Sequence, residues 1–120
     1  MVDDESYVRS LVSEYLTLDG NVVETAETGR EGLEKFAAGT FDLVITDRSM
    51  SDMNGDEVAR AIKEVAPGKQ VIMLTEFGEM MEVAGEHPTG VDLIVTKPLT
   101  QDDLRAAMFK LLGQSAGDVR

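Results

Sequence analysis

The sequence contains no cysteine, no tryptophan and a single histidine. The lack of cysteine excludes disulfide bonds, thiolate zinc sites and thiol nucleophiles. The one histidine, His87, has no second histidine with which to build a metal site. Because it stands beside Pro88, we expect it to lie in an exposed loop without a chemical role.

Positive charge is also scarce, since 11 Lys and Arg residues stand against 23 Asp and Glu residues, for a formal net charge of -12. This excess argues against a nucleic-acid partner, because phosphate backbones are bound by surplus Lys and Arg. It equally disfavours contact with an anionic membrane surface. No apolar run approaches the roughly 20 residues of a membrane-spanning helix, and we expect no signal peptide. We therefore expect a soluble, cytoplasmic protein.

The length of 120 residues and the hydrophobic fraction of 42% predict one packed domain, because domains most often hold about 100–150 residues. We expect residues 1–113 to form this domain and residues 114–120 to be a flexible polar tail.

Short apolar runs alternate with longer amphipathic stretches along the chain. The runs 43–46, 71–75 and 93–96 are almost continuously apolar and rich in Val and Ile. This composition is typical of parallel strands that are covered on both faces. The run 22–26 is more mixed and predicts an edge strand, and only Met1 and Val2 remain for a strand before the first helix.

Apolar residues recur at helical spacing between these runs. The stretches are 8–16, 33–37, 58–66 and 104–112, with a weaker one at 79–84. Thr28 with Glu31 and Thr100 with Asp103 fit helix caps. Strands alternating with helices predict a doubly wound α/β domain with helices on both faces of a parallel sheet.

Polar residues follow each predicted strand where it ends, and the carboxyl ends of parallel strands are where ligands collect in such folds. These residues are Asp3, Asp4, Asp47, Thr75 and Lys97. Any one aspartate alone is better explained as a turn or helix-cap residue. Together, the crowded carboxylates resist ionisation unless a cation joins them, and Mg²⁺ suits such oxygen ligands.

These residues belong to motifs that together resemble the receiver domain of response regulators over about residues 2–112. The motifs, in chain order, are Val2-Asp3-Asp4-Glu5, Asp42-Leu43-Val44-Ile45-Thr46-Asp47, Asp52-Met53-Asn54-Gly55, Thr75 and Lys97-Pro98. The resemblance implies a flavodoxin-like fold, with a five-stranded parallel sheet in the order 2-1-3-4-5 and five helices.

The resemblance also implies roles for individual residues. Asp47 is expected to accept a phosphoryl group from a phosphohistidine in an Mg²⁺-dependent reaction. Asp4 is expected to bind Mg²⁺ directly, Asp3 through water, and Ser49 through its carbonyl oxygen. Lys97 would clamp the phosphoryl group, and Thr75 would hydrogen-bond to it and report phosphorylation to the neighbouring helix. Gly55 and Pro98 would have structural roles.

The expected partner is a histidine kinase or a histidine phosphotransfer protein, and the oligomeric state stays open. The domain is expected to be a phosphoacceptor and not an enzyme. The short first strand suggests a piece of a larger protein, such as the C-terminal receiver of a hybrid sensor histidine kinase.

Three positions depart from the receiver pattern. Ser51 replaces a proline, Glu76 replaces a small residue, and Ile94 stands where many receivers have an aromatic switch residue. Glu76 either obstructs a phosphodonor or turns outward.

These departures leave an alternative function, a receiver-fold interaction module that no longer depends on phosphorylation. An aspartyl-phosphate hydrolase is disfavoured by Ser49, where such enzymes have a second aspartate. A flavin binder is disfavoured by the acidic segment 3–5.

Overall fold

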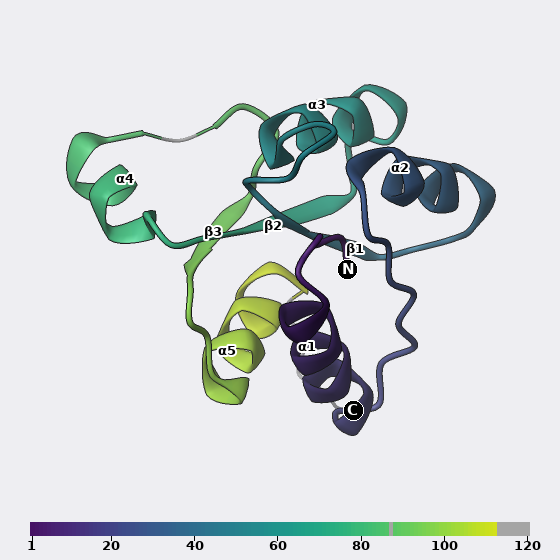
Figure 1. Ribbon diagram of the computed structural model, residues 1–120, viewed down its shortest axis with the longest axis horizontal. Helices are drawn as coiled ribbons and strands as arrows, with labels where there is room; N and C mark the ends of the chain where they lie inside the picture. The colour runs from purple at the N-terminus through teal and green to yellow at the C-terminus, as the bar shows by residue number, and fades with distance from the viewer. Residues whose placement is uncertain (87, 113–120) are drawn as a thin grey trace.

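A computed structural model describes residues 1–86 and 88–112 of the chain. The elements, in chain order, are α1 (Ser6–Leu18), α2 (Gly29–Ala38), β1 (Leu43–Asp47), α3 (Gly55–Val65), β2 (Gln70–Thr75), α4 (Gly78–Ala84), β3 (Leu93–Thr96) and α5 (Gln101–Leu112), so strands and helices alternate from β1 onward. The three strands form one parallel sheet in the order β1-β2-β3. The doubly wound α/β prediction is thus confirmed (Figure 1). The expectations for His87 and for the tail 114–120 concern residues outside those described.

The sheet continues beyond β1 through single bridges. Val2 forms parallel bridges to both Thr46 and Ala26, and the Val2 amide donates to the Ile45 carbonyl at 2.8 Å. The spatial sequence Ala26, Val2, β1, β2, β3 therefore follows the expected order 2-1-3-4-5. Within the described residues, however, only three segments form full strands, and the expected strand at 22–26 does not form. This segment is joined to the sheet through the bridge between Val2 and Ala26, and Val22 is 96% exposed.

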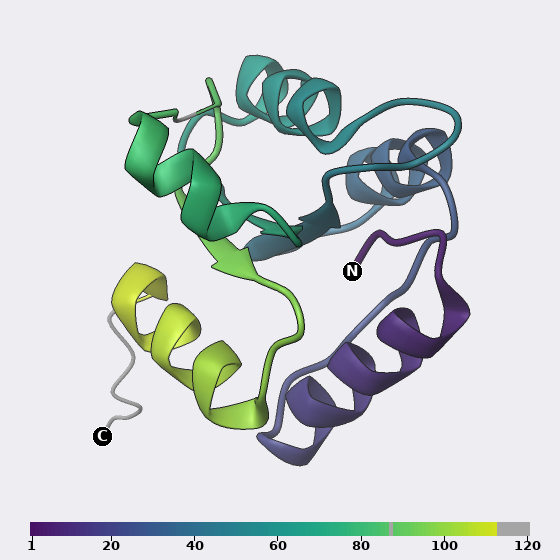
Figure 2. The ribbon, with the colours of Figure 1, turned by 60° about the vertical axis from the view of Figure 1, so that its left-hand side comes forward.

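The strands β1 and β2 are buried on both faces, as their apolar composition predicts, whereas all four residues of β3 are only partly buried. Figures 1 and 2 show α1 and α5 on one side of the sheet and α2 and α3 on the other. The core on the first side comprises Val12, Leu16, Ile45, Ile72, Leu74, Leu99, Leu104 and Ala107. The core on the second comprises Val44, Val58, Ala59, Ile62, Val71, Met73 and Val91. Side chains alternate between the two cores along β1 and β2, because successive residues of a strand point to opposite faces.

Local sequence signals place the helix ends. The Thr28 hydroxyl accepts a hydrogen bond from the Glu31 amide at the start of α2. Thr100 and Asp103 cap α5 reciprocally. Both caps were expected, and α4 ends where Gly85 takes a positive φ of 73°. No helix in residues 1–86 and 88–112 is long and apolar enough to cross a membrane.

Gly55 lies where α3 begins against the end of β1. A Cβ atom there would lie 2.5 Å from the Asp47 carbonyl oxygen and 3.0 Å from the Arg48 Cα, both in the backbone. Only glycine allows this approach, which confirms the structural role expected for Gly55.

We predict that Gly55→Ala lowers the free energy of unfolding by about 1–3 kcal/mol, because backbone must move to admit the methyl group. Urea unfolding followed by circular dichroism measures the change. Gly68→Ala is the matched control, since a Cβ at Gly68 meets no atom within 4 Å. Equal stability of the two variants would contradict the predicted clash.

Candidate functional site

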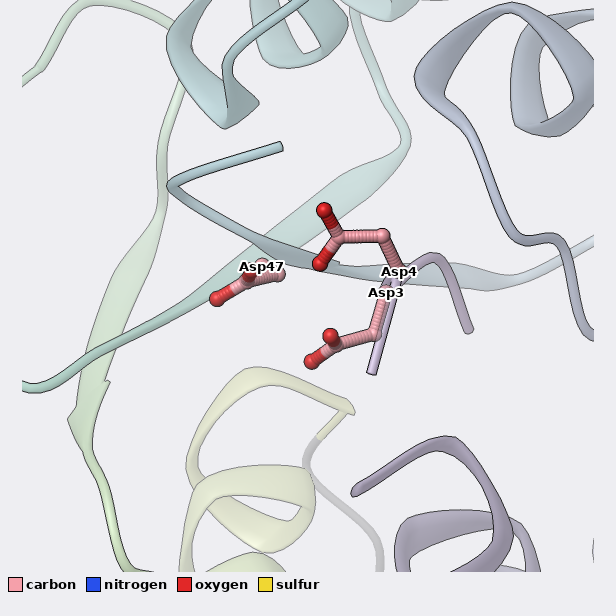
Figure 3. Close-up of side chains that lie close together, drawn as sticks. All are labelled: Asp3, Asp4 and Asp47. Atoms are coloured by element: carbon pink, nitrogen blue, oxygen red, sulfur yellow. The ribbon is translucent and has the colours of Figure 1, made fainter. Parts of the chain in front are cut away.

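Three aspartates meet at the carboxyl end of β1. Asp3 and Asp4 follow the Val2 bridge, and Asp47 is the last residue of β1. One carboxylate oxygen from each lies within 4.8 Å of the others, and Figure 3 shows the three side chains close together. Asp3 and Asp47 are buried, whereas Asp4 is exposed. The convergence expected from the strand ends is therefore present.

Lys97 brings a positive charge into this cluster from the end of β3. Its ammonium nitrogen lies 2.8 Å from Asp47 Oδ1, 3.3 Å from Asp3 Oδ2 and 3.4 Å from Glu5 Oε1. The Lys97 side chain is only 10% exposed, and its amide donates to the Thr75 carbonyl at 2.8 Å. A cis peptide bond joins Lys97 to Pro98.

Asp3 and Asp4 differ in the contacts that their carboxylate oxygens form. Asp3 Oδ1 accepts from the Glu5 amide at 2.9 Å, and Asp3 Oδ2 faces Lys97. The Asp4 carboxylate has no hydrogen-bond partner among the described residues. Asp4 thus offers its oxygens to a ligand more readily than Asp3 does.

Thr75 is buried at the end of β2, and its hydroxyl oxygen accepts a hydrogen bond from the Phe77 amide at 3.1 Å. This contact connects the strand end to the start of α4. The hydroxyl proton remains available to a further acceptor, because a hydroxyl group both donates and accepts.

Burial raises the pKa of the Asp47 carboxyl above its ordinary value, and the Asp4 charge adds to this effect, although Lys97 opposes it. Burial also raises the pKa of Asp3, with a further contribution from the Asp47 charge. Burial by itself would lower the pKa of Lys97, but the hydrogen bond to Asp47 and the charges of both aspartates raise it overall. The lysine therefore stays charged while the aspartates resist ionisation.

The remaining residues named from the sequence lie around the cluster. Ser49, Ser51 and Glu76 are exposed, and Ile94 packs against the second core. Glu76 lines a hollow together with Glu5, Tyr7, Lys97 and Leu99. The metal-binding role of the Ser49 carbonyl stays a prediction.

Sequence reasoning missed the functions of two acidic residues. Glu5 was recognised only as part of a motif, yet it supplies a third carboxylate to Lys97. Asp52 accepts hydrogen bonds from the Gly29 and Arg30 amides at 3.0 and 2.9 Å and so caps α2. These backbone hydrogen bonds, that from Arg30 above all, lower the pKa of Asp52. The amides that Asp52 accepts from lie 22 and 23 positions away in the sequence, too far to be inferred from a local pattern.

The arrangement combines buried carboxylates, an exposed carboxylate and an ammonium group on one edge of the sheet. Carboxylates of this kind bind hard divalent cations and attack electrophilic phosphorus.

Comparison with known proteins identifies the family. The model of the response regulator receiver domain matches residues 1–109, and the chain belongs to this family. It is similar to the transcriptional regulatory protein GlrR of Escherichia coli K12, with 38% identity over 97% of this chain and 26% of the relative. It is 30% identical to the chemotaxis protein CheY of Halobacterium salinarum over 93% of each protein.

Solved structures agree with this assignment. A receiver domain protein of Clostridium thermocellum matches with a TM-score of 0.81 and 31% identity, over 96% of this chain and 93% of the other. The response regulator TrrA of Thermotoga maritima, solved in complex with Mg²⁺ and a beryllium fluoride, matches with a TM-score of 0.81 and 35% identity, over 92% and 94%. The chain is therefore a CheY-like receiver domain, the phosphoaccepting domain of two-component systems.

The chain spans only part of several longer relatives. It covers 26% of GlrR and 53% of the response regulator VraR of Staphylococcus saprophyticus.

The raised pKa of Asp47 makes a prediction about stability. A carboxyl whose pKa is raised by folding destabilises the fold once it ionises, so its contribution to the free energy of unfolding falls as pH rises through that pKa. We predict that Asp47→Asn raises the Tm at pH 7 by a few degrees, about 2–5 °C, because Lys97 keeps Asp3 and Glu5 as partners.

Thermal unfolding by circular dichroism between pH 4 and pH 8 measures this effect, and the advantage of Asp47→Asn is expected to shrink toward pH 4. Asp42→Asn at an exposed position is the matched control. A lower Tm for Asp47→Asn than for Asp42→Asn at pH 7 would show that pairing with Lys97 outweighs burial.

Proposed function

We propose that Asp47 accepts a phosphoryl group from the phosphohistidine of a histidine kinase or a histidine phosphotransfer protein. The observation that carries the proposal is the buried Asp47 carboxylate, held 2.8 Å from Lys97 Nζ beside two further aspartates. A carboxylate oxygen attacks phosphorus, the phosphorus–nitrogen bond breaks, and the departing imidazole keeps the bonding electrons and takes up a proton. The product is an acyl phosphate on Asp47.

The cluster fits a Mg²⁺ ion. Three carboxylates offer oxygen atoms within 4.8 Å of one another, and Mg²⁺ prefers one or two carboxylates together with water and phosphate oxygens. Asp4 and Asp47 would hold the ion directly, with the Ser49 carbonyl, and Asp3 would hold it through water because both its oxygens are engaged. When bound, the ion supplies positive charge that offsets the charge on the phosphoryl oxygens.

Lys97 and Thr75 complete the proposed site from the ends of β3 and β2. The Lys97 ammonium group pairs with Asp47. Once Asp47 carries a phosphoryl group, the ammonium group would form an ion pair with one of the phosphoryl oxygens. The Thr75 hydroxyl proton would be donated to another of these oxygens. The same hydroxyl accepts a hydrogen bond from the amide of Phe77, the residue that precedes α4. A movement of the Thr75 side chain would therefore also displace Phe77.

The charged residues of the site support phosphate transfer over the alternative of a phosphate-independent interaction module. Such a module has no need for three aspartate carboxylates gathered beside a largely buried ammonium group, an arrangement in which the buried Asp3 and Asp47 resist ionisation. Within this proposal the domain is a cytoplasmic phosphoacceptor and not an enzyme. A hybrid histidine kinase as parent chain stays a prediction, since the relatives described above are response regulators and CheY proteins.

We predict that the wild-type protein gains one phosphoryl group on incubation with acetyl phosphate and Mg²⁺, and that Asp47→Asn gains none. Intact-protein mass spectrometry measures the gain, with and without Mg²⁺. Asp42→Asn, an exposed aspartate on the same chain, should react like wild type. Uptake of the group by Asp47→Asn would refute the assignment of the nucleophile.

We also predict that Mg²⁺ stabilises the wild-type fold and that Asp4→Asn weakens this effect. At a Mg²⁺ concentration 100 times Kd, linkage adds about 2.7 kcal/mol to the free energy of unfolding. Urea unfolding at several Mg²⁺ concentrations measures Kd for each variant. Because Asp4 is exposed, Asp4→Asn should retain wild-type stability without Mg²⁺. An unchanged Kd in Asp4→Asn would exclude Asp4 as a direct ligand.

A further inference from the structure

Arg48, the residue directly after Asp47, directs its side chain away from the aspartate cluster. Its backbone is held on both sides, since its amide donates to the Leu74 carbonyl at 3.0 Å and its carbonyl accepts from the Gly55 amide at 2.8 Å. Its guanidinium group contacts α4 and α3, and the side chain is 29% exposed. A charged group so far withdrawn from water needs compensating contacts.

The contacts of the Arg48 guanidinium are unusual. Nη1 donates to the Met81 sulfur at 3.0 Å, although a thioether is a weak acceptor. Nε lies 3.6 Å from Asp56 Oδ1, which is an ion-pair distance and too long for a hydrogen bond. That oxygen is buried and has no hydrogen-bond partner among the described residues. The guanidinium group therefore joins the end of β1 to both neighbouring helices.

Helix α4 is short, and it also contacts β3, where the buried Gly78 lies against Thr96. It contains seven residues, and its N-cap residue Phe77 forms no capping hydrogen bond through its side chain. Phe77, Met80 and Val83 are 54%, 68% and 90% exposed. Figures 1 and 2 show α4 at the margin of the molecule, beyond the centre of the sheet.

Met81 is the one large side chain that α4 buries, at 2% exposure. It belongs to neither of the two hydrophobic cores. Short helices are marginal without tertiary contacts, so the contact of Met81 with Arg48 is a principal attachment of α4.

We propose that Arg48 is a positioning residue that fastens α4 to the end of β1 through Met81, with Asp56 as its counter-ion. Because Arg48 follows Asp47 in the chain, a displacement of Asp47 moves the base of this link and with it α4. The coupling of Asp47 to α4 is the second step of this proposal and rests on the proposed function. The first step, the attachment of α4 by Arg48, does not.

Hydrogen–deuterium exchange of peptides covering Gly78–Ala84 tests the link. We predict that Arg48→Met speeds exchange in α4 by about five- to tenfold, the factor that corresponds to the loss of one ordinary hydrogen bond, because the thioether is a weak acceptor. Exchange of β2 amides serves as the internal reference for global unfolding. Arg60→Met, which removes an exposed arginine of α3, should leave α4 unchanged.

Two further variants separate the link from simple loss of packing. Met81→Leu keeps apolar volume but removes the sulfur acceptor, and it should speed exchange in α4 as well. Combined with Arg48→Met it should add little, because both changes break one contact. Arg48→Lys keeps the charge beside Asp56 and should fall between wild type and Arg48→Met. Exchange in α4 of Arg48→Met equal to that of wild type would overturn the proposal.

The same samples treated with acetyl phosphate and Mg²⁺ test the second step. Phosphorylation should change exchange in α4 of the wild type, and Arg48→Met should lose most of this change while still gaining the phosphoryl group by mass. A full-sized change in phosphorylated Arg48→Met would overturn the coupling. If the wild type gains no phosphoryl group, the proposed function fails. The comparison of exchange in α4 between wild type and Arg48→Met without acetyl phosphate still tests whether Arg48 attaches α4.

Discussion

The ion contacts of Lys97 hold the site together. One ammonium group lies within 3.4 Å of carboxylates from Asp3, Glu5 and Asp47, and without it the two buried aspartates would face each other without compensation. A buried charge is tolerated only when it is paired. The sheet also fixes the position of this charge, because the Lys97 amide donates a hydrogen bond to the Thr75 carbonyl on the neighbouring strand.

The parallel sheet is what brings these groups to one edge. The Val2 bridge, β1, β2 and β3 all run in the same direction, so their carboxyl ends deliver Asp3 and Asp4, Asp47, Thr75 and Lys97 side by side. Cores on both faces keep the strands in register. The site can therefore retain unfavourable aspartate charges, since packing elsewhere maintains the fold.

The aspartate cluster and Lys97 lie at the carboxyl edge of the sheet, whereas the Arg48 guanidinium group contacts α3 and α4. Helix α4 is short and exposes two large apolar side chains, Met80 and Val83, and its N-cap residue Phe77 is exposed as well. A short helix with little buried surface opens locally at smaller energetic cost than the core.

The sequence alone determined the α/β class, the positions of the three strands, the caps of α2 and α5 and the residues that meet at the candidate site, because these follow from local periodicity and from which residues end each strand. Tertiary structure decided the rest. It reduced the first two expected strands to bridges at Val2 and Ala26, engaged both oxygens of Asp3 while leaving Asp4 free, and joined Arg48 to Met81, 33 positions away. Such contacts depend on how distant segments pack, and no local pattern encodes them.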